Sequence, residues 1–358
     1  MKKQAPPEAN FPDRLEGIAH SGTFSPGILI IPAISLLVLV ALVLLLSVNP
    51  GKTLYFFFLG PFRNIYGFGN MLNAAIPLVL GALGITIAVK SGSLNLGGEG
   101  QVYFGAFTSA ITALSLSRMG AAGSVIAVLA GFISAGALAA FCGFCKARWN
   151  TNELISTFLL SNAVIPVVNY LATGPFLDPE TSLQSTRKIT PALRLPLILK
   201  PSNLSAAAFI AIASVIIVHY FLAKTKKGYE LRMAGNNEIF ARYGGINVKG
   251  NTVLAMFISG GFYGLAGSLA VLGTYYAVIK EFSAGLGWNG LAVALIAGFF
   301  PPAIIPAAIF FAWLSAGGRI AMQNTEMTFE VVSIVQAVIF FLATSLLLRN
   351  VFARRRRK

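Results

Sequence analysis

Charged side chains are scarce in this chain of 358 residues, where they make up 11%, about half the fraction usual in soluble proteins. Acidic residues number 12, and there are two histidines and two cysteines. So few ligands and bases predict no metal site and no catalytic residues. A P-loop is also missing, because Leu46 stands where the triplet Gly51-Lys52-Thr53 would need its first glycine. We therefore expect this chain to bind no cofactor of its own.

Long apolar runs are abundant instead, and the mean hydropathy is +0.75. The run ILIIPAISLLVLVALVLLLSV, from Ile28 to Val48, has no charge and is long enough to cross ~30 Å of hydrocarbon as a helix. Nine further apolar segments follow, at 71–89, 102–116, 123–145, 153–173, 204–223, 252–279, 288–300, 302–318 and 331–348. The sequence thus predicts an all-α polytopic membrane protein with about ten transmembrane helices.

Basic residues predict the orientation, because cytoplasmic loops carry an excess of Lys and Arg. One basic cluster lies in the loop 224–251 and another in the tail 349–358. The predicted division is a cytoplasmic tail 1–27, a transmembrane domain 28–348 and a basic cytoplasmic tail 349–358, with both termini inside. An external loop at 174–203 fits less well, since it carries Arg187, Lys188, Arg194 and Lys200. The net charge of +15 is explained by the basic loops and tails that set the topology in the lipid bilayer, so we expect no nucleic acid as partner.

The loop 224–251 contains a short predicted helix at 237–243. Asn236 can cap its start, Glu238 lies in the first turn, and Arg242 lies in the last turn before Gly244-Gly245. At 100° per residue, one arc carries the apolar side chains, namely Ile239, Phe240 and Tyr243. So short a helix is unstable alone, so it either lies on lipid headgroups or fits a groove of a protein partner.

The sequence GYELRMAGNNEIFARYGGINV resembles the cytoplasmic coupling loop of permeases from ATP-binding-cassette (ABC) importers for ribose-type sugars, branched-chain amino acids and nucleosides. The matching residues are Gly228, Arg232, Gly235, Asn237, Ala241, Gly245, Ile246 and Val248. Phe240 stands where that family usually has alanine. The resemblance implies contact with an ATPase through Gly228, Arg232, Gly235, Asn237, Ile239, Phe240, Ala241, Arg242, Tyr243 and Gly245.

Two more stretches are similar to the nucleoside branch of this family: SLNLGGEGQ at 93–101 and NELISTFLLSN at 152–162. The resemblance implies a permease subunit of an importer, without its own ATPase site, for a nucleoside or, alternatively, a sugar or a flavin. It implies a heterodimer with a second permease, an ATPase subunit that binds ATP and Mg²⁺, and an external substrate-binding protein. The expected location is a prokaryotic plasma membrane, the inner membrane in Gram-negative cells.

The stretch SGSLNLGGEGQVYFGAF, from Ser91 to Phe107, combines five glycines with a carboxylate between two apolar runs. Glycine-rich backbone disfavours a continuous helix, so we predict a broken or re-entrant segment near 91–101. Its carboxylate, Glu99, either faces the translocation path or joins helices. The candidate path residues are Asn95, Glu99, Gln101, Asn152, Glu153 and Asn162. Farther along, Gly260 and Gly264 form a G-x-x-x-G that predicts close helix packing.

Two other classes of protein compete with the importer hypothesis. An ion-coupled secondary transporter would need intramembrane acids in symmetry-related halves, and Glu99 with Glu330 is the available pair. The sequence shows no convincing internal repeat, and such a carrier needs no coupling loop. A membrane enzyme would need a paired catalytic constellation, which is absent from the sequence.

Overall fold

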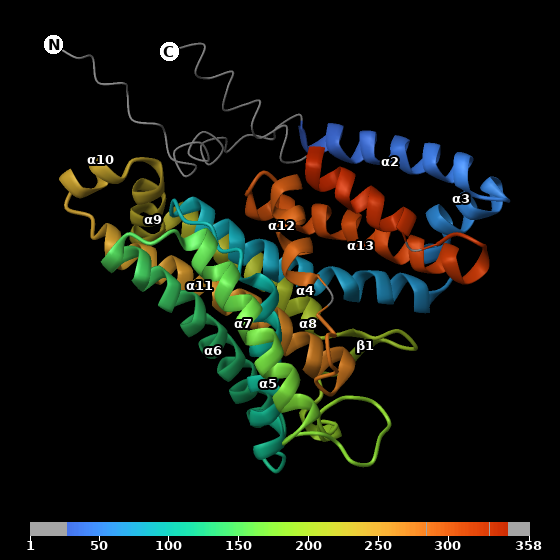
Figure 1. Cartoon of the computed structure of the whole chain (residues 1–358), viewed down its shortest axis with the longest axis horizontal. Coiled ribbons are helices and arrows are strands. Elements are labelled where there is room, and N and C mark those ends of the chain that lie inside the picture. Colours follow the sequence, from blue (N-terminus) through green and yellow to red (C-terminus); the bar gives the residue numbers. More distant parts are fainter. Residues whose placement is uncertain (1–26, 284, 329, 343–358) are drawn as a thin grey trace.

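Helices make up nearly all of the regular structure (Figure 1). The structure is a computed structural model, and it describes residues 27–283, 285–328 and 330–342. The helices are α2 (Gly27–Leu46), α3 (Pro50–Leu59), η1 (Gly60–Phe62), α4 (Ile65–Lys90), α5 (Gly98–Ser115), α6 (Gly120–Trp149), α7 (Glu153–Thr173), η2 (Pro191–Leu193), α8 (Ala207–Lys224), α9 (Lys226–Asn236), α10 (Glu238–Tyr243), α11 (Val248–Ala270), the π-helical η3 (Val271–Tyr275), α12 (Leu286–Ile296), α13 (Pro301–Asn324) and a helix at Glu330–Leu342. A small antiparallel pair, β1 (Leu197–Leu199) and β2 (Leu204–Ser205), completes the described part. The predicted all-α class is confirmed.

Six of the described helices are long and apolar enough to cross a membrane: α4, α6, α7, α8, α11 with η3, and α13. Shorter apolar helices lie at Pro32–Leu46, Leu286–Ile296 and Glu330–Leu342. Each of the ten apolar segments marked in the sequence overlaps a helix. The chain is a polytopic membrane protein.

The helices α4 and α11 form the centre of the molecule. In the most apolar window of each, 78% of the residues are buried, against 17% in α7, which lies at the periphery. Small residues let α6 approach α11: a Cβ on Gly264 would lie 2.2 Å from the carbonyl oxygen of Gly131, and one on Gly260 would lie 2.5 Å from that of Ala135. The close packing predicted from G-x-x-x-G is confirmed.

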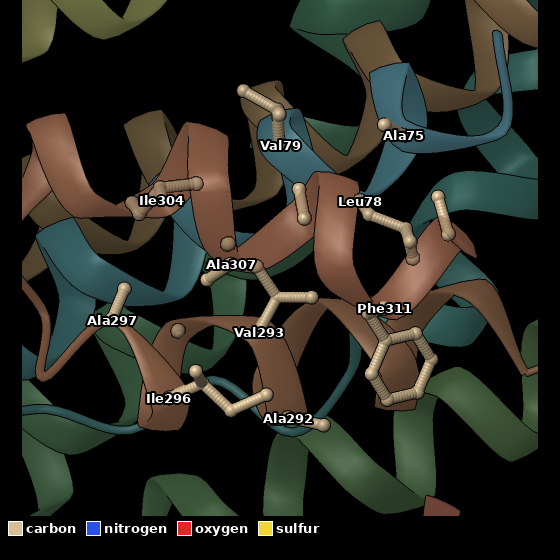
Figure 2. Close-up of a cluster of buried hydrophobic side chains, with 14 of the residues drawn as sticks. Ala75, Leu78, Val79, Ala292, Val293, Ile296, Ala297, Ile304, Ala307 and Phe311 are labelled. Atoms are coloured by element: carbon tan, nitrogen blue, oxygen red, sulfur yellow. The ribbon is translucent and has the colours of Figure 1, made fainter. Parts of the chain in front are cut away.

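The short helix α12 lies against α4 and α13 (Figure 2). Leu78 of α4, Val293 of α12 and Phe311 of α13 are at most 4% exposed and belong to one apolar cluster. With 11 residues, α12 is about 17 Å long, too short to cross the hydrocarbon core alone. Because α12 is packed into the apolar core, its first turn lies inside the protein and not at an end of the bundle.

The two ends of the helix bundle carry different structures (Figure 1). Helices α9 and α10 lie at one end, called here the α10 end, where Gly235 packs against Gly92. The segment 174–205 lies at the other, the β1 end, where the backbone N–H of Asn203 donates to Asn70 over 3.0 Å. Helix α4 therefore runs from the β1 end to the α10 end.

Candidate functional site

The helix predicted in the loop 224–251 is present as α10. Its N-cap is Asn237, whose Oδ1 accepts from the backbone N–H of Phe240 over 2.9 Å. The expectation that Asn236 caps it was wrong, because Asn236 still belongs to α9, a separate helix capped by Thr225. Glu238 pairs with Arg242 on the helix surface, and Gly245 (φ +75°) provides the left-handed turn after it.

The apolar arc of α10 faces away from the protein. Ile239, Phe240 and Tyr243 are 69%, 60% and 88% exposed, whereas Ala241 is 1% exposed. Three large apolar side chains gathered on one short helix are unfavourable in water. The helix is held from its inner side and offers its apolar arc to something outside the chain.

Glycines fix α9 against the membrane helices. A Cβ on Gly235 would lie 2.4 Å from the carbonyl oxygen of Lys90, and one on Gly228 would lie 2.0 Å from that of Phe221. No side chain fits at either position, so α9 contacts the ends of α4 and α8 through backbone. Arg232, also on α9, has a buried Nε atom without a hydrogen-bond partner in the described part of the chain.

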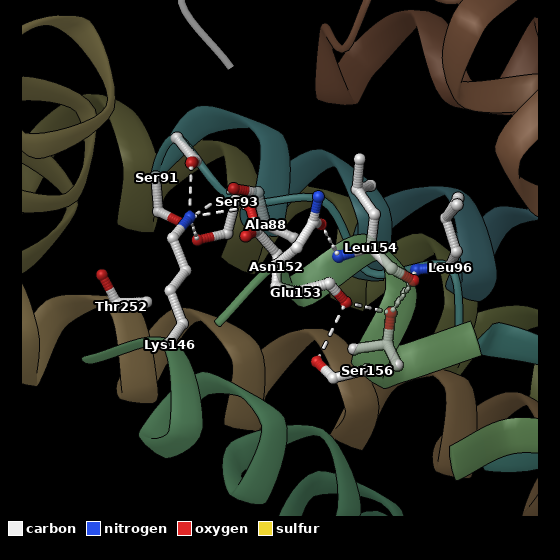
Figure 3. Close-up of polar contacts among 12 residues, drawn as sticks. Ala88, Ser91, Ser93, Leu96, Lys146, Asn152, Glu153, Leu154, Ser156 and Thr252 are labelled. Carbon is white, nitrogen blue, oxygen red and sulfur yellow. Dashed lines mark hydrogen bonds and ion pairs between the residues drawn. The ribbon is translucent and has the colours of Figure 1, made fainter. Parts of the chain in front are cut away.

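Lys146, near the end of α6, ties three segments together at the α10 end (Figure 3). Its Nζ donates to the carbonyl oxygen of Gly92 and to Oγ of Ser93, each over 3.1 Å, and to Oε1 of Glu153 over 2.7 Å. The Glu153 side chain is only 7% exposed. Removing either partner would leave a poorly solvated charge, so this contact holds the α4–α5 connection against α6 and α7.

The interruption before α5 is shorter than expected. Non-helical backbone covers residues 91–97, and α5 begins at Gly98, so Glu99 and Gln101 lie in its first turn instead of in the break. Glycine at 97, 98 and 100 serves close packing there, for a Cβ at Gly100 would lie 2.6 Å from the carbonyl oxygen of Ser161. Glycine content alone could not separate packing from a helix break.

Side chains satisfy the backbone and amide groups of this segment. Asn95 bonds Gln101 (2.7 Å) and Ser259 of α11 (3.0 Å) through its Nδ2. The backbone N–H groups of Leu96 and Gly100 donate to Thr157 and Ser161, two hydroxyls of α7. Irregular backbone can therefore be buried here without unpaired groups. Asn95 and Gln101 are at most 3% exposed and link helices.

The Glu99 carboxylate joins α5 to the start of α12. Its Oε1 accepts from the N–H of Gly285 over 3.0 Å, and its Oε2 accepts from the N–H of Gly287 over 2.9 Å. A negative charge at a helix N-terminus is stabilised by free N–H groups and the helix dipole. A Cβ on Gly287 would lie 2.2 Å from the backbone nitrogen of Glu99, so the two helix starts touch.

The two remaining candidates lie on α7. Oδ1 of Asn152 accepts from the N–H of Leu154 over 2.9 Å and caps the helix. Asn162 is exposed, and its amide donates to the carbonyl oxygen of Phe158 over 2.8 Å. The structure thus brings Glu99 and Gln101, in the first turn of α5, together with Asn95 in the non-helical segment before it. Glu153 lies with Lys146, closer to the α10 end.

A cavity of about 700 Å³ with both polar and apolar walls opens between α4, η3, α12 and α13, with Gln336 of the last described helix also on its wall. None of the six candidate path residues lies among its lining residues. Its polar walls include Asn70, Asn73, Asn203, Thr274, Asn289, Ser315, Arg319 and Gln336. A second cavity of about 490 Å³ shares Asn70 and Arg319 with it and reaches Arg63 and Asn64 at the β1 end. We call the first the outer cavity, a name that refers only to its position toward the β1 end.

Sequence reasoning missed the outer cavity because its polar residues come from separate helices, one or two from each. Polar residues within or beside apolar segments, such as Gln336 in 331–348 and Arg319 at the end of 302–318, were the visible signals, since such side chains often face a wet cavity. Among the described residues, no group of three or more His, Cys, Asp or Glu side chains could hold a metal ion.

The bundle of apolar helices thus has a cavity with partly polar walls toward the β1 end and a short helix with an exposed apolar arc at the α10 end. Comparison with known proteins identifies the class of protein: the profile of the family described as the branched-chain amino acid transport system permease component matches residues 67–344. The chain belongs to this family and is the permease component of an ABC importer, a transport protein and no enzyme.

Several relatives are similar over most of their length. The probable riboflavin import permease protein RfuC of Treponema pallidum is 34% identical over 316 residues, covering 86% of this chain and 82% of the relative. The guanosine ABC transporter permease protein NupP of Bacillus subtilis is 32% identical, covering 84% and 87%. The glucose ABC transporter permease protein TsgB13 of Haloferax volcanii is 27% identical, covering 84% and 82%. No solved structure matches the chain. The family resemblance read from the sequence is confirmed.

Proposed function

We propose that this chain forms the translocation path for a nucleoside or a related polar solute, driven by a separate ATPase that binds α10. The observation that carries the coupling role is the apolar arc of α10, which is exposed although Ala241 of the same helix is buried and Gly228 and Gly235 pack α9 against the bundle. A buried aromatic in a partner groove is a common binding hot spot, and Phe240 and Tyr243 are available for that role.

A chain of packing contacts and hydrogen bonds connects the α9–α10 unit to the outer cavity. Movement of α9 would reach Gly92 through Gly235, because the two backbones touch. From Gly92 the chain runs through the network of Asn95 to Glu99, which holds the N–H groups of Gly285 and Gly287. Gly285 lines the outer cavity. A displacement at the ATPase would therefore be passed to the cavity wall by packed backbone and hydrogen bonds.

The remaining partners follow from this assignment. ATP and Mg²⁺ would bind the ATPase subunit, and an external substrate-binding protein would deliver the solute at the β1 end, where the segment 174–203 is available. A second permease would complete the path. Bacillus subtilis has two guanosine permease proteins, NupP and NupQ, and both are similar to this chain, which supports a heterodimer.

The finer topology belongs to the same proposal. Ten spans with both termini in the cytoplasm of a prokaryote place α10 inside, where the ATPase is. The separation of α10 and the segment 174–205 at opposite ends of the bundle supports this arrangement (Figure 1). The interruption at 91–97 would then lie buried between α4 and α5, nearer the cytoplasmic side.

The substrate is proposed from the relatives named for riboflavin, guanosine and glucose, with a nucleoside first. The test is uptake by the purified permeases, reconstituted in liposomes with their ATPase and external binding protein. We expect ATP-dependent accumulation of labelled guanosine, with riboflavin and glucose assayed in parallel. An ATPase lacking its P-loop lysine is the control. Uptake that follows a sodium or proton gradient and ignores ATP would overturn the proposal.

A further inference from the structure

The outer cavity has an unbalanced charge. Arg319 lies on its wall and Arg63 lies farther out, whereas no carboxylate is found among the described residues that line either cavity. Neither guanidinium has an ion-pair partner within the described ranges. The fields of both arginines therefore act on the water and solutes in the cavities.

Amide side chains supply most of the other polar groups. The amide nitrogen of Asn73 donates to Thr274 over 2.9 Å, and that of Gln336 donates to Ser315 over 2.9 Å. Each of these hydrogen bonds holds its amide group in one orientation. Asn289, one turn inside α12, makes no side-chain hydrogen bond to another described residue. Tyr275 adds an aromatic surface that is 40% exposed. The walls thus offer neutral donors and acceptors beside a fixed positive charge.

We propose that the outer cavity is the binding site for the transported solute and that Arg319 makes it select neutral or anionic solutes over cations. The solute would be a polar molecule whose carbonyl or hydroxyl oxygens accept from Arg319 and whose remaining groups bond the amides, Asn289 among them. This rests on the proposed function. In a cavity with low-dielectric walls, a fixed charge raises the local concentration of opposite charges by about tenfold or more.

The test measures charge selectivity without using the transported solute. Asn289→Cys is introduced into the assembled transporter in intact cells, with Cys142 and Cys145 replaced by alanine. It is treated from outside with methanethiosulfonate reagents that carry either a sulfonate or a trimethylammonium group. Ser182→Cys, exposed in the segment 174–205, is the matched control. Asn73→Cys gives a second cavity position if the first variant is absent from the membrane.

We expect the sulfonate reagent to be favoured over the ammonium reagent about tenfold more at Asn289→Cys than at Ser182→Cys. Arg319→Gln should remove this preference, and Arg187→Gln, which changes an exposed arginine of the segment 174–205, should leave it. Equal ratios at the two cysteines, no reaction at either cavity position, or a preference that survives Arg319→Gln would overturn the inference. None of these outcomes depends on ATP or on uptake, so the importer proposal stands or falls separately.

Discussion

At the residue scale, Glu99 shows how one carboxylate meets two demands. An ionised side chain inside a spanning segment is costly unless it is fully hydrogen-bonded. Both of its oxygens accept backbone N–H groups at the start of α12, which would otherwise lack partners. The same contact stabilises the charge and fixes the depth at which α12 begins.

Substitution of Glu99 should therefore lower stability and transport in steps. Glu99→Leu leaves two part-buried N–H groups without their carboxylate partner, at a cost of up to about 1–3 kcal/mol each, whereas Glu99→Gln keeps one acceptor and leaves one N–H facing an amide donor. We expect uptake at equal expression, and the melting temperature of the purified complex, to fall in the order Glu, Gln, Leu. Glu180→Gln, exposed in the segment 174–205, is the control. Near-normal uptake and melting in both Glu99 variants would show that the carboxylate is dispensable.

At the scale of elements, α10 is a six-residue helix that would not persist in isolation. The Asn237 cap, the Glu238–Arg242 pair and the burial of Ala241 hold it in place. Its inner side therefore attaches it to the protein, and its apolar arc stays exposed, as the proposed contact with the ATPase requires.

The substitution Phe240→Asp tests that contact. A carboxylate buried without a partner in an apolar groove of the ATPase would weaken the binding of the two proteins by several kcal/mol. We expect a permease that still reaches the membrane but loses the ATPase during purification, with substrate-driven ATP hydrolysis abolished. Glu238→Gln, on the opposite arc, should retain both. Full association and uptake in Phe240→Asp would place α10 on lipid headgroups instead.

At the scale of the whole molecule, the orientation of the bundle decides which end meets the ATPase. The basic segment 174–203 opposed the assignment in the sequence. The fold softens this conflict for one residue: the Arg194 guanidinium stacks on the Tyr276 ring at 4.5 Å, and its Nε donates to the carbonyl oxygen of Ile189. That arginine is engaged within the folded β1 end and is less available to lipid headgroups.

Labelling of single cysteines in intact cells checks the orientation. An impermeant maleimide should modify Ser182→Cys and leave Asn237→Cys unmodified until the membrane is permeabilised. Both positions are exposed or half-exposed in the structure, so access depends on the side of the membrane and not on burial. Labelling of Asn237→Cys in intact cells would reverse the topology and remove the docking role of α10.

Much of the architecture could be predicted from the sequence, because membrane spans need long apolar runs and short helices need local caps. The apolar segments, the helix at 238–243 and the close packing at Gly260 and Gly264 follow from such local patterns. The amphipathic helix α3 was missed, since its run PGKTLYFFFL is too short to read as a span.

Tertiary structure alone decided what the polar residues do. Asn95, Glu99 and Gln101 are near one another in sequence, but their partners, Ser259 and the start of α12, lie about 160–190 residues away. The outer cavity draws its lining from several helices, each contributing one or two polar residues that look like isolated exceptions along the chain. Local sequence determines which segments enter the membrane, because hydrophobic transfer acts on each segment by itself. The packing of those segments determines which polar groups meet, because hydrogen bonds require neighbours in space.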